Sequence, residues 1–204
     1  YFYDWINGTK TTLNCNFDRD MKRWGEREDC TSKEINNNVK YVSSENIWNV
    51  GPVFDGKPSR FTFSSDSTLI NDKYYFRKLY SSTEHGGFDT SGTYYREENG
   101  LVYQLDLFNN KEKVVFNFQL NVGDSITVKD LEQEMKLKVI KIDSVIYNDN
   151  IYRRRTTLKC ENNDEYEWIE GFGTTYLIYP YCYLDNSEGT ITCFYVSGNL
   201  VFEN

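Results

Sequence analysis

The chain has 204 residues, with 23 lysine and arginine residues against 31 aspartate and glutamate residues, for a formal net charge of −8. An acidic chain repels phosphate backbones, so the composition argues against a nucleic-acid partner. Hydrophobic residues make up 39% and aromatic residues 17% of the sequence. Aromatic side chains bury large areas and suit strands, so we expect one ordered β domain with an aromatic core.

Cysteine usage indicates the compartment. Five cysteines accompany a single histidine, which does not fit a zinc site. Cysteines in this pattern are typical of disulfides in an oxidising compartment, so we expect a secreted, extracellular or cell-surface protein. The sequence begins at Tyr1 without an apolar leader, and we expect a mature product whose signal peptide has been removed. No apolar run reaches the roughly 18 residues of a membrane-spanning helix, so no membrane span is expected.

Residues 1–45 are expected to form an N-terminal extension, because their composition differs from that of the rest of the chain. The run 22–29 is highly charged, and we expect at most one short helix, near 18–27. Cys15 and Cys30 flank this polar segment and are expected to form a disulfide that staples it.

Residues 46–204 are expected to form a single antiparallel β domain. Tyr, Phe and Thr enrichment with period-2 alternation predicts strands, and no amphipathic helix separates them. The predicted strands are 59–64, 73–80, 92–97, 101–107, 113–118, 125–128, 135–145, 151–160, 165–170, 175–179, 181–184, 190–196 and 200–203. Short turns such as Asn99-Gly100 favour an antiparallel meander. Because sheet edges need covering, a curved roll or partly closed barrel is favoured over a flat sheet.

The predicted strand 135–145 contains a change of phase. Leu137 and Val139 share one phase of the period-2 pattern, whereas Ile140 and Ile142 share the other. A change of this kind predicts a β-bulge or a bend between faces. The following strand carries Arg153-Arg154-Arg155, a short charge run that we expect to form a solvated face.

Two cysteines near the end of the chain flank a predicted hairpin. Cys182 and Cys193 lie on either side of the turn 185–189, and we expect them to form a disulfide. Closing a loop of about a dozen residues contributes roughly 2–3 kcal/mol in the chain-entropy model. Cys160 is then left over, either as a buried thiol or as the partner of a cysteine outside this sequence.

One motif carries a family resemblance. Tyr-Glu-Trp-Ile-Glu-Gly-Phe-Gly at 166–173, followed by Cys182 and by Cys193-Phe194, resembles a β-rich domain of secreted Bacteroidetes proteins, which often carry a type IX secretion signal. The same register continues upstream, so the resemblance covers about 47–202. Its further segments are 72–79, 92–98, 115–118 and 122–125. The resemblance implies a secreted β domain and carries no activity with it.

His85 is the first candidate for catalysis. It is the only histidine of the chain and lies in a loop rich in Ser, Gly and Asp. It could act as a general base that Asp89 orients. The chain has no Gly-x-Ser-x-Gly motif, and no cysteine is placed as a nucleophile for it. An exposed loop histidine without a catalytic role is the simpler interpretation.

Glu170 is the second candidate, because carboxylates beside a tryptophan are found in glycoside hydrolases. It follows Trp168 by two residues, so the two side chains share a face of the predicted strand. A second acid would have to come from elsewhere in the fold. The structural alternative places Trp168 in the core, with Gly171 and Gly173 in a sharp turn.

Tyrosine pairs are the candidates for binding. Neighbouring rings in a strand point to opposite faces, so one ring of a pair such as Tyr94-Tyr95 is expected to be exposed. Exposed Tyr and Trp beside Arg are typical of surfaces that bind glycans or proteins, although such rings also decorate β-proteins that have no ligand. The candidate binding residues are Tyr94, Tyr95, Arg96, Trp168, Glu170 and Tyr176.

The chain presents no coherent catalytic set, which favours a non-enzymatic interaction or adhesion domain with a glycan or protein partner. The alternative is a secreted enzyme with a pocket inside the β-roll that uses Glu170 or His85. The Asp-Gly turns lack the acidic spacing of a calcium loop, and no phosphate-binding motif is present. Neither a metal ion nor a cofactor is therefore expected.

Overall fold

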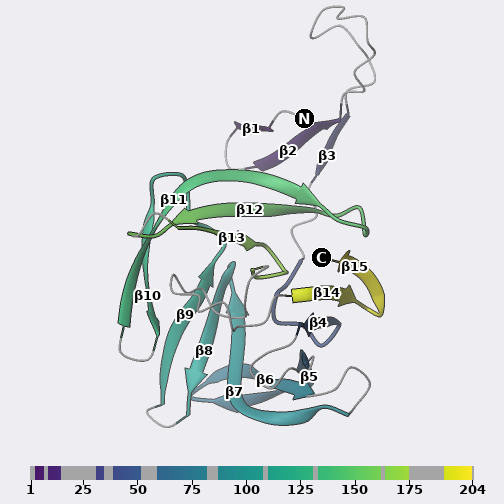
Figure 1. The fold of residues 1–204 in the computed structure, drawn as a ribbon, viewed down its shortest axis with the longest axis vertical. Helices are drawn as coiled ribbons and strands as arrows, with labels where there is room; N and C mark the ends of the chain where they lie inside the picture. Colours follow the sequence, from purple (N-terminus) through teal and green to yellow (C-terminus); the bar gives the residue numbers. More distant parts are fainter. Residues whose placement is uncertain are drawn as a thin grey trace, which may run out of the picture. The chain divides into compact units, whose positions relative to one another are not determined.

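The computed structural model describes residues 3–6, 9–14, 31–34, 39–51, 59–81, 87–107, 110–130, 133–161, 164–174 and 191–203. The chain divides into two compact units, Tyr1–Asn38 and Val39–Asn204. The regular elements in the described ranges are all β-strands (Figure 1), which confirms the predicted all-β fold. None of the described residues belongs to a helix that could cross a membrane.

The first unit contains a small antiparallel sheet that the sequence analysis did not predict. Its strands are β1 (Tyr3–Ile6), β2 (Thr9–Asn14) and β3 (Thr31–Glu34), in the order β1-β2-β3. The predicted helix at 18–27 and the predicted Cys15–Cys30 disulfide lie outside the described residues.

The second unit contains an eight-stranded antiparallel sheet, called the large sheet below, in the order β15-β14-β4-β5-β6-β7-β8-β9. Its strands are β4 (Asn46–Val50), β5 (Ser59–Ile70), β6 (Lys73–Ser81), β7 (Asp89–Glu98), β8 (Leu101–Asp106), β9 (Lys111–Asn117), β14 (Ile191–Val196) and β15 (Asn199–Glu203). Strands β5–β9 form part of the predicted meander, whereas β4 is not among the predicted strands. The prediction is wrong at the C-terminal hairpin, which returns to pair with β4. This pairing rests on distant side chains: the rings of Trp48 and Phe194 lie 5.0 Å apart.

The small sheet of the second unit has the order β10-β11-β12-β13, with β10 (Ser125–Asp130), β11 (Gln133–Ile146), β12 (Tyr152–Lys159) and β13 (Glu165–Ile169). The register between β11 and β12 shifts between Val139 and Lys141, which confirms the predicted bulge. Neither sheet closes into a barrel within the described residues. The architecture is therefore two open antiparallel sheets.

An aromatic core lies between the large sheet and the small sheet, as the composition predicts. Trp48 of β4 stacks on Phe61 of β5 with 4.5 Å between ring centroids. Trp168 of β13 meets Phe116 of β9 edge to face at 5.5 Å. Residues from both sheets belong to this one buried cluster, called the main core below.

The turn after β13 confirms the structural interpretation of the Trp168–Gly173 motif. Gly171 and Gly173 have φ values of 74° and 95°, a region that L side chains rarely adopt. A Cβ atom at Gly173 would lie 2.8 Å from the ring of Tyr41. The turn also presents a carbonyl to the core, because the indole N–H of Trp48 donates to the Phe172 oxygen at 2.9 Å.

The predicted Cys182–Cys193 disulfide is wrong, because Cys193 is a free, half-buried thiol. Strand β14 pairs with β15 and β4, so Cys193 lies opposite Glu203 and Asn49. Cys160 is buried and disulfide-bonded, with a partner outside the described residues. The buried-thiol interpretation of Cys160 is therefore wrong as well.

Candidate functional site

Strand β6 has an unusual position, because both neighbouring strands bulge beside its centre. The registers with β5 and with β7 shift at the level of Arg77 and Lys78. Serine side chains take over part of the backbone pairing there. The Arg77 N–H donates to Ser64 Oγ at 3.0 Å, and Ser91 Oγ donates to the Lys78 oxygen at 2.6 Å. Bulges change the direction of side chains and are frequent next to functional sites, so β6 is the centre of the candidate site.

One face of β6 carries a row that we call the aromatic strip: Tyr74, Phe76, Lys78 and Tyr80. Side chains alternate along a strand, so these residues share a face. Tyr74 is 65% exposed and Tyr80 is 46% exposed, whereas Phe76 packs against the main core between them. Leu69 of β5 lies directly opposite Tyr74 and is also exposed. The strip is thus buried at its centre and open at both ends.

Lys78 is the buried cation of the aromatic strip. Its Nζ lies 4.6 Å from the ring centroid of Phe61, in cation–π contact. Burial disfavours the charged form of the amine and lowers the pKa of Lys78 to about 8. A lysine in this range changes its protonation state close to neutral pH.

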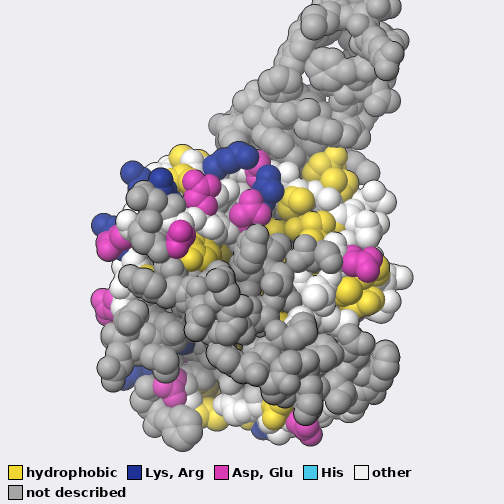
Figure 2. Space-filling model, viewed as in Figure 1, with side chains coloured by type: hydrophobic (Ala, Val, Ile, Leu, Met, Phe, Trp, Pro, Cys, Tyr) yellow, Lys and Arg dark blue, Asp and Glu magenta, His cyan; other side chains and the backbone are white. Residues whose placement is uncertain are grey.

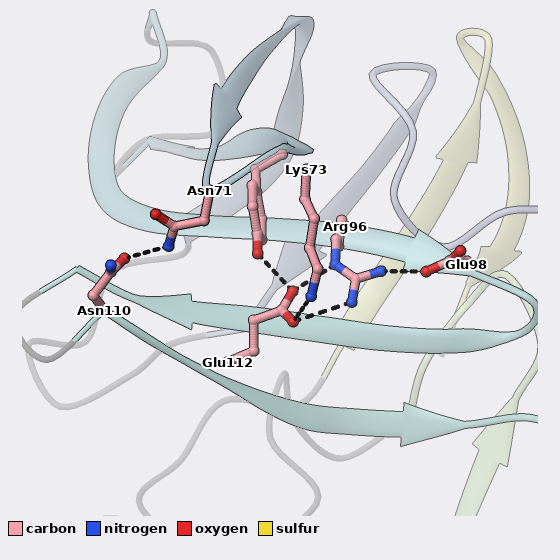
Figure 3. A network of polar contacts seen from close by, with 7 residues as sticks. Asn71, Lys73, Arg96, Glu98, Asn110 and Glu112 are labelled. Carbon is pink, nitrogen blue, oxygen red and sulfur yellow. Dashed lines mark hydrogen bonds and ion pairs between the residues drawn. The ribbon is translucent and has the colours of Figure 1, made fainter.

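The opposite face of β6 carries a closed set of polar contacts, called the Glu112 network below (Figure 3). Glu112 of β9 accepts hydrogen bonds from Lys73 Nζ at 2.5 Å, from the Tyr75 hydroxyl at 2.6 Å and from Arg96 Nε at 2.5 Å. Arg96 also donates to Glu98 at 2.7 Å.

The Glu112 network shows that the large sheet curls towards this face. Strands β6 and β9 are separated by β7 and β8, so they would lie about 14 Å apart in a flat sheet. The turn between β5 and β6 also contacts the turn between β8 and β9, because the Asn71 side chain donates a hydrogen bond to the Asn110 side chain at 2.9 Å. Inside the curl lies a second core of Tyr75, Tyr94 and Leu105.

The charges of the Glu112 network compensate each other. The hydrogen bond from Arg96 lowers the pKa of Glu112 to about 2, and the same bond raises the pKa of Arg96. The guanidinium of Arg96 also stacks 3.8 Å from the ring centroid of Tyr103. With these charges paired, the network holds the curl rather than offering a ligand a free charge.

Tyr94, Tyr95 and Arg96, three of the predicted binding residues, lie on β7. The two tyrosine rings belong to different cores and therefore point to opposite faces, as predicted. Neither ring is exposed, so the expectation that one of them reaches solvent is wrong. The curl of the sheet buries Tyr94, the main core buries Tyr95, and Arg96 belongs to the Glu112 network.

The other predicted residues do not form one surface with these. Trp168 is fully buried, and its indole N–H has no hydrogen-bond partner in the described part of the chain. Glu170 is half-buried in the turn after β13, where its backbone N–H donates to the Arg154 oxygen at 2.9 Å. Tyr176 and His85 lie outside the described residues.

A second acid near Glu170 was missed by the sequence analysis. Burial raises the pKa of Glu97, and the negative charge of Glu170 raises it further. The Glu97 carboxylate accepts a hydrogen bond from the Val42 N–H at 3.0 Å. The period-2 pattern places Glu97 on the same face as Tyr95, which could have identified it as a carboxylate directed towards the core.

The outer face of the small sheet carries paired charges as well. Asp143 accepts two hydrogen bonds from Arg155, both at 2.7 Å, and the Arg155 bond lowers the pKa of Asp143 to about 2. Figure 2 shows basic and acidic side chains interleaved where β11 and β12 run. The prediction of a solvated arginine run is wrong for Arg153 and Arg154, which are buried. Arg153 pairs with Asp149.

The described residues contain no group of His, Cys, Asp or Glu side chains that could hold a metal ion. Comparison with known proteins gives no relative: no family model, no curated protein and no solved structure matches the chain. The function is therefore inferred from the residues themselves.

Proposed function

We propose that the chain is a non-enzymatic binding domain, secreted or at the cell surface, whose aromatic strip binds an extended glycan. The observation that carries the proposal is the exposure of Tyr74 and Tyr80 on one face of a single regular strand. Rings six residues apart on a strand are about 20 Å apart, which leaves room for several sugar rings. Tyrosine offers large, rigid contact area at a low cost in conformational entropy.

The composition of the aromatic strip favours a glycan over a purely apolar partner. Sugar rings present C–H faces that pack on aromatic rings and hydroxyls that hydrogen-bond to tyrosine. Lys78 is buried between the rings, so the contacts with a glycan come from the two exposed tyrosines. The resemblance of segment 166–173 to secreted Bacteroidetes domains supports an extracellular location. A protein partner that anchors on the same rings is the other outcome of the test.

The test is a glycan and protein-partner screen with the purified chain, followed by titration calorimetry on the hits. Tyr74→Ala and Tyr80→Ala should each weaken binding about tenfold or more, because exposed aromatic anchors supply most of the contact energy. Leu107→Ala is the matched control, since Leu107 is an exposed apolar side chain directly after β8. Equal affinities for all three variants and the unmodified chain would contradict the proposal.

A second candidate function is acid–base hydrolysis of a glycan, and the raised pKa of Glu97 beside Glu170 favours it. A carboxyl with a raised pKa can act as the general acid while an ionised neighbour acts as base or nucleophile. Polysaccharide hydrolysis by the unmodified chain that disappears in both Glu97→Gln and Glu170→Gln would establish this function. Hydrolysis that survives either substitution, or no hydrolysis at all, would exclude it.

A further inference from the structure

Arg77 differs from the arginines that pair with acids. Its Nε donates to the Tyr94 hydroxyl at 2.9 Å, and its Nη2 donates to the same oxygen. The guanidinium carbon lies 5.0 Å from the Tyr94 ring centroid. Within the described part of the chain, no carboxylate forms an ion pair with Arg77, whereas Arg96 and Arg155 each pair with acids.

We propose that Arg77 is a binding site for a small oxyanion, a carboxylate or a sulfate group, on the face of β6 opposite the aromatic strip. Tyr94 offers a hydroxyl rather than a carboxylate, so it orients the guanidinium without supplying an acid as its ion-pair partner. Guanidinium has five N–H donors in a planar fork, and donors remain free of the tyrosine. That fork matches two oxygens of a carboxylate or sulfate.

The site is held on a rigid base. Tyr94 is buried in the second core with Tyr75 and Leu105, so the hydroxyl that orients Arg77 cannot move freely. The backbone of Arg77 is fixed as well, because its N–H donates to Ser64 Oγ. A charged group held in place by its support loses little entropy when it takes a ligand.

The bulge of β7 leaves room beside Tyr94. Gly92 is exposed, and a side-chain carbon added there would meet no atom within 4 Å. The β5 bulge contributes Asp66, which is exposed and forms no ion pair among the described residues. This nearby acid and the net charge of −8 disfavour a polyanion, so the ligand carries a single anionic group.

The test is an NMR titration that follows the backbone amide resonances of Tyr94 and residue 77 at constant ionic strength, and also the Arg77 Nε–H resonance in the unmodified chain. The probes are acetate, sulfate, glucuronate and, as the neutral control, glucose. We expect a saturable shift with the anions and none with glucose. Arg77→Lys should weaken binding about tenfold or more, because lysine lacks the fork. Asp66→Asn should strengthen binding, and Lys136→Gln, which removes an exposed cation from the small sheet, should leave it unchanged.

Thermal melts of each variant establish that it is folded. Tighter binding of glucuronate than of acetate would identify the ligand as a sugar acid. Equal binding would show that the site recognises the oxyanion group alone. A shift that sodium chloride reproduces, no saturable shift with any anion, or an unchanged affinity in Arg77→Lys would overturn the proposal.

Discussion

Glu112 and Lys78 lie on opposite faces of the large sheet, and their pKa values are lowered for opposite reasons. Hydrogen bonds from Arg96 and its neighbours favour the charged form of Glu112, whose pKa falls to about 2. Burial favours the neutral form of Lys78, whose pKa falls to about 8. Ionised Glu112 therefore stabilises the fold, whereas protonated Lys78 costs stability. The comparison separates the Glu112 network, which holds the sheet together, from the aromatic strip, which is open to a ligand at its ends.

The largest expected effect on stability is at Glu112. Glu112→Gln should lower the free energy of unfolding by about 1–3 kcal/mol, because it leaves Arg96 and Lys73 with weaker acceptors. Tyr74→Ala on the aromatic strip should change it by less than about 0.5 kcal/mol, as expected for an exposed side chain. Denaturant unfolding of the two variants measures the difference. Equal losses would show that the two faces do not divide the roles in this way.

The contribution of Glu112 to stability should also appear in the pH dependence of unfolding at acid pH. The folded pKa of Glu112, about 2, lies below its ordinary value of 4.5. Its contribution to stability is therefore complete above about pH 4.5 and is lost as the pH falls towards 2. The free energy of unfolding should depend less on pH across this window for Glu112→Gln than for the unmodified chain. Asp143, whose pKa is also about 2, should leave a residual slope in the variant.

Lys78 should give a pH dependence of the same sign, but in the alkaline range. Its folded pKa, about 8, lies below its ordinary value of 10.5, so the unfolded chain binds more protons between these values. Stability should therefore rise by up to about 3 kcal/mol as the pH increases through this range. Lys78→Met should remove the rise. A rise that persists in Lys78→Met would assign it to another group.

Glu97 should give the smallest effect. Its pKa is raised by burial, so its ionisation costs stability as the pH rises above its ordinary value of 4.5. Glu97→Gln should raise the free energy of unfolding at pH 7 by less than about 1 kcal/mol, since glutamine can still accept the Val42 hydrogen bond. At pH 3 the substitution should be neutral. A loss of stability at pH 7 would contradict this, because it would mean that the folded chain stabilises the ionised Glu97 carboxylate.

Local patterns in the sequence predicted the parts of the fold that depend on neighbouring residues. The Asn99-Gly100 turn has positive φ at both residues, and the phase change at Val139 coincides with a bulge. Contacts between distant segments could not be predicted in this way. The pairing of β14 with β4 depends on residues more than a hundred positions apart in the chain, such as Phe194 and Trp48.

The candidate site shows the same limit. The period-2 alternation correctly predicted that Tyr94 and Tyr95 point to opposite faces of the strand. The burial of Tyr94, however, depends on the curl of the large sheet. That curl depends on Glu112 reaching Lys73 and Tyr75 across two strands, a contact that no period in the sequence encodes. The exposure of Tyr74 follows from its place near the end of the β5–β6 hairpin, beyond the main core.

The most direct test of the central claim is an NMR map of the chain with the glycan that binds best in the screen. The aromatic strip predicts the largest shifts at Tyr74 and Tyr80, with little change at Glu112. Shifts concentrated at Glu97 and Glu170, or a screen in which no glycan binds, would contradict the proposal that β6 carries the binding site.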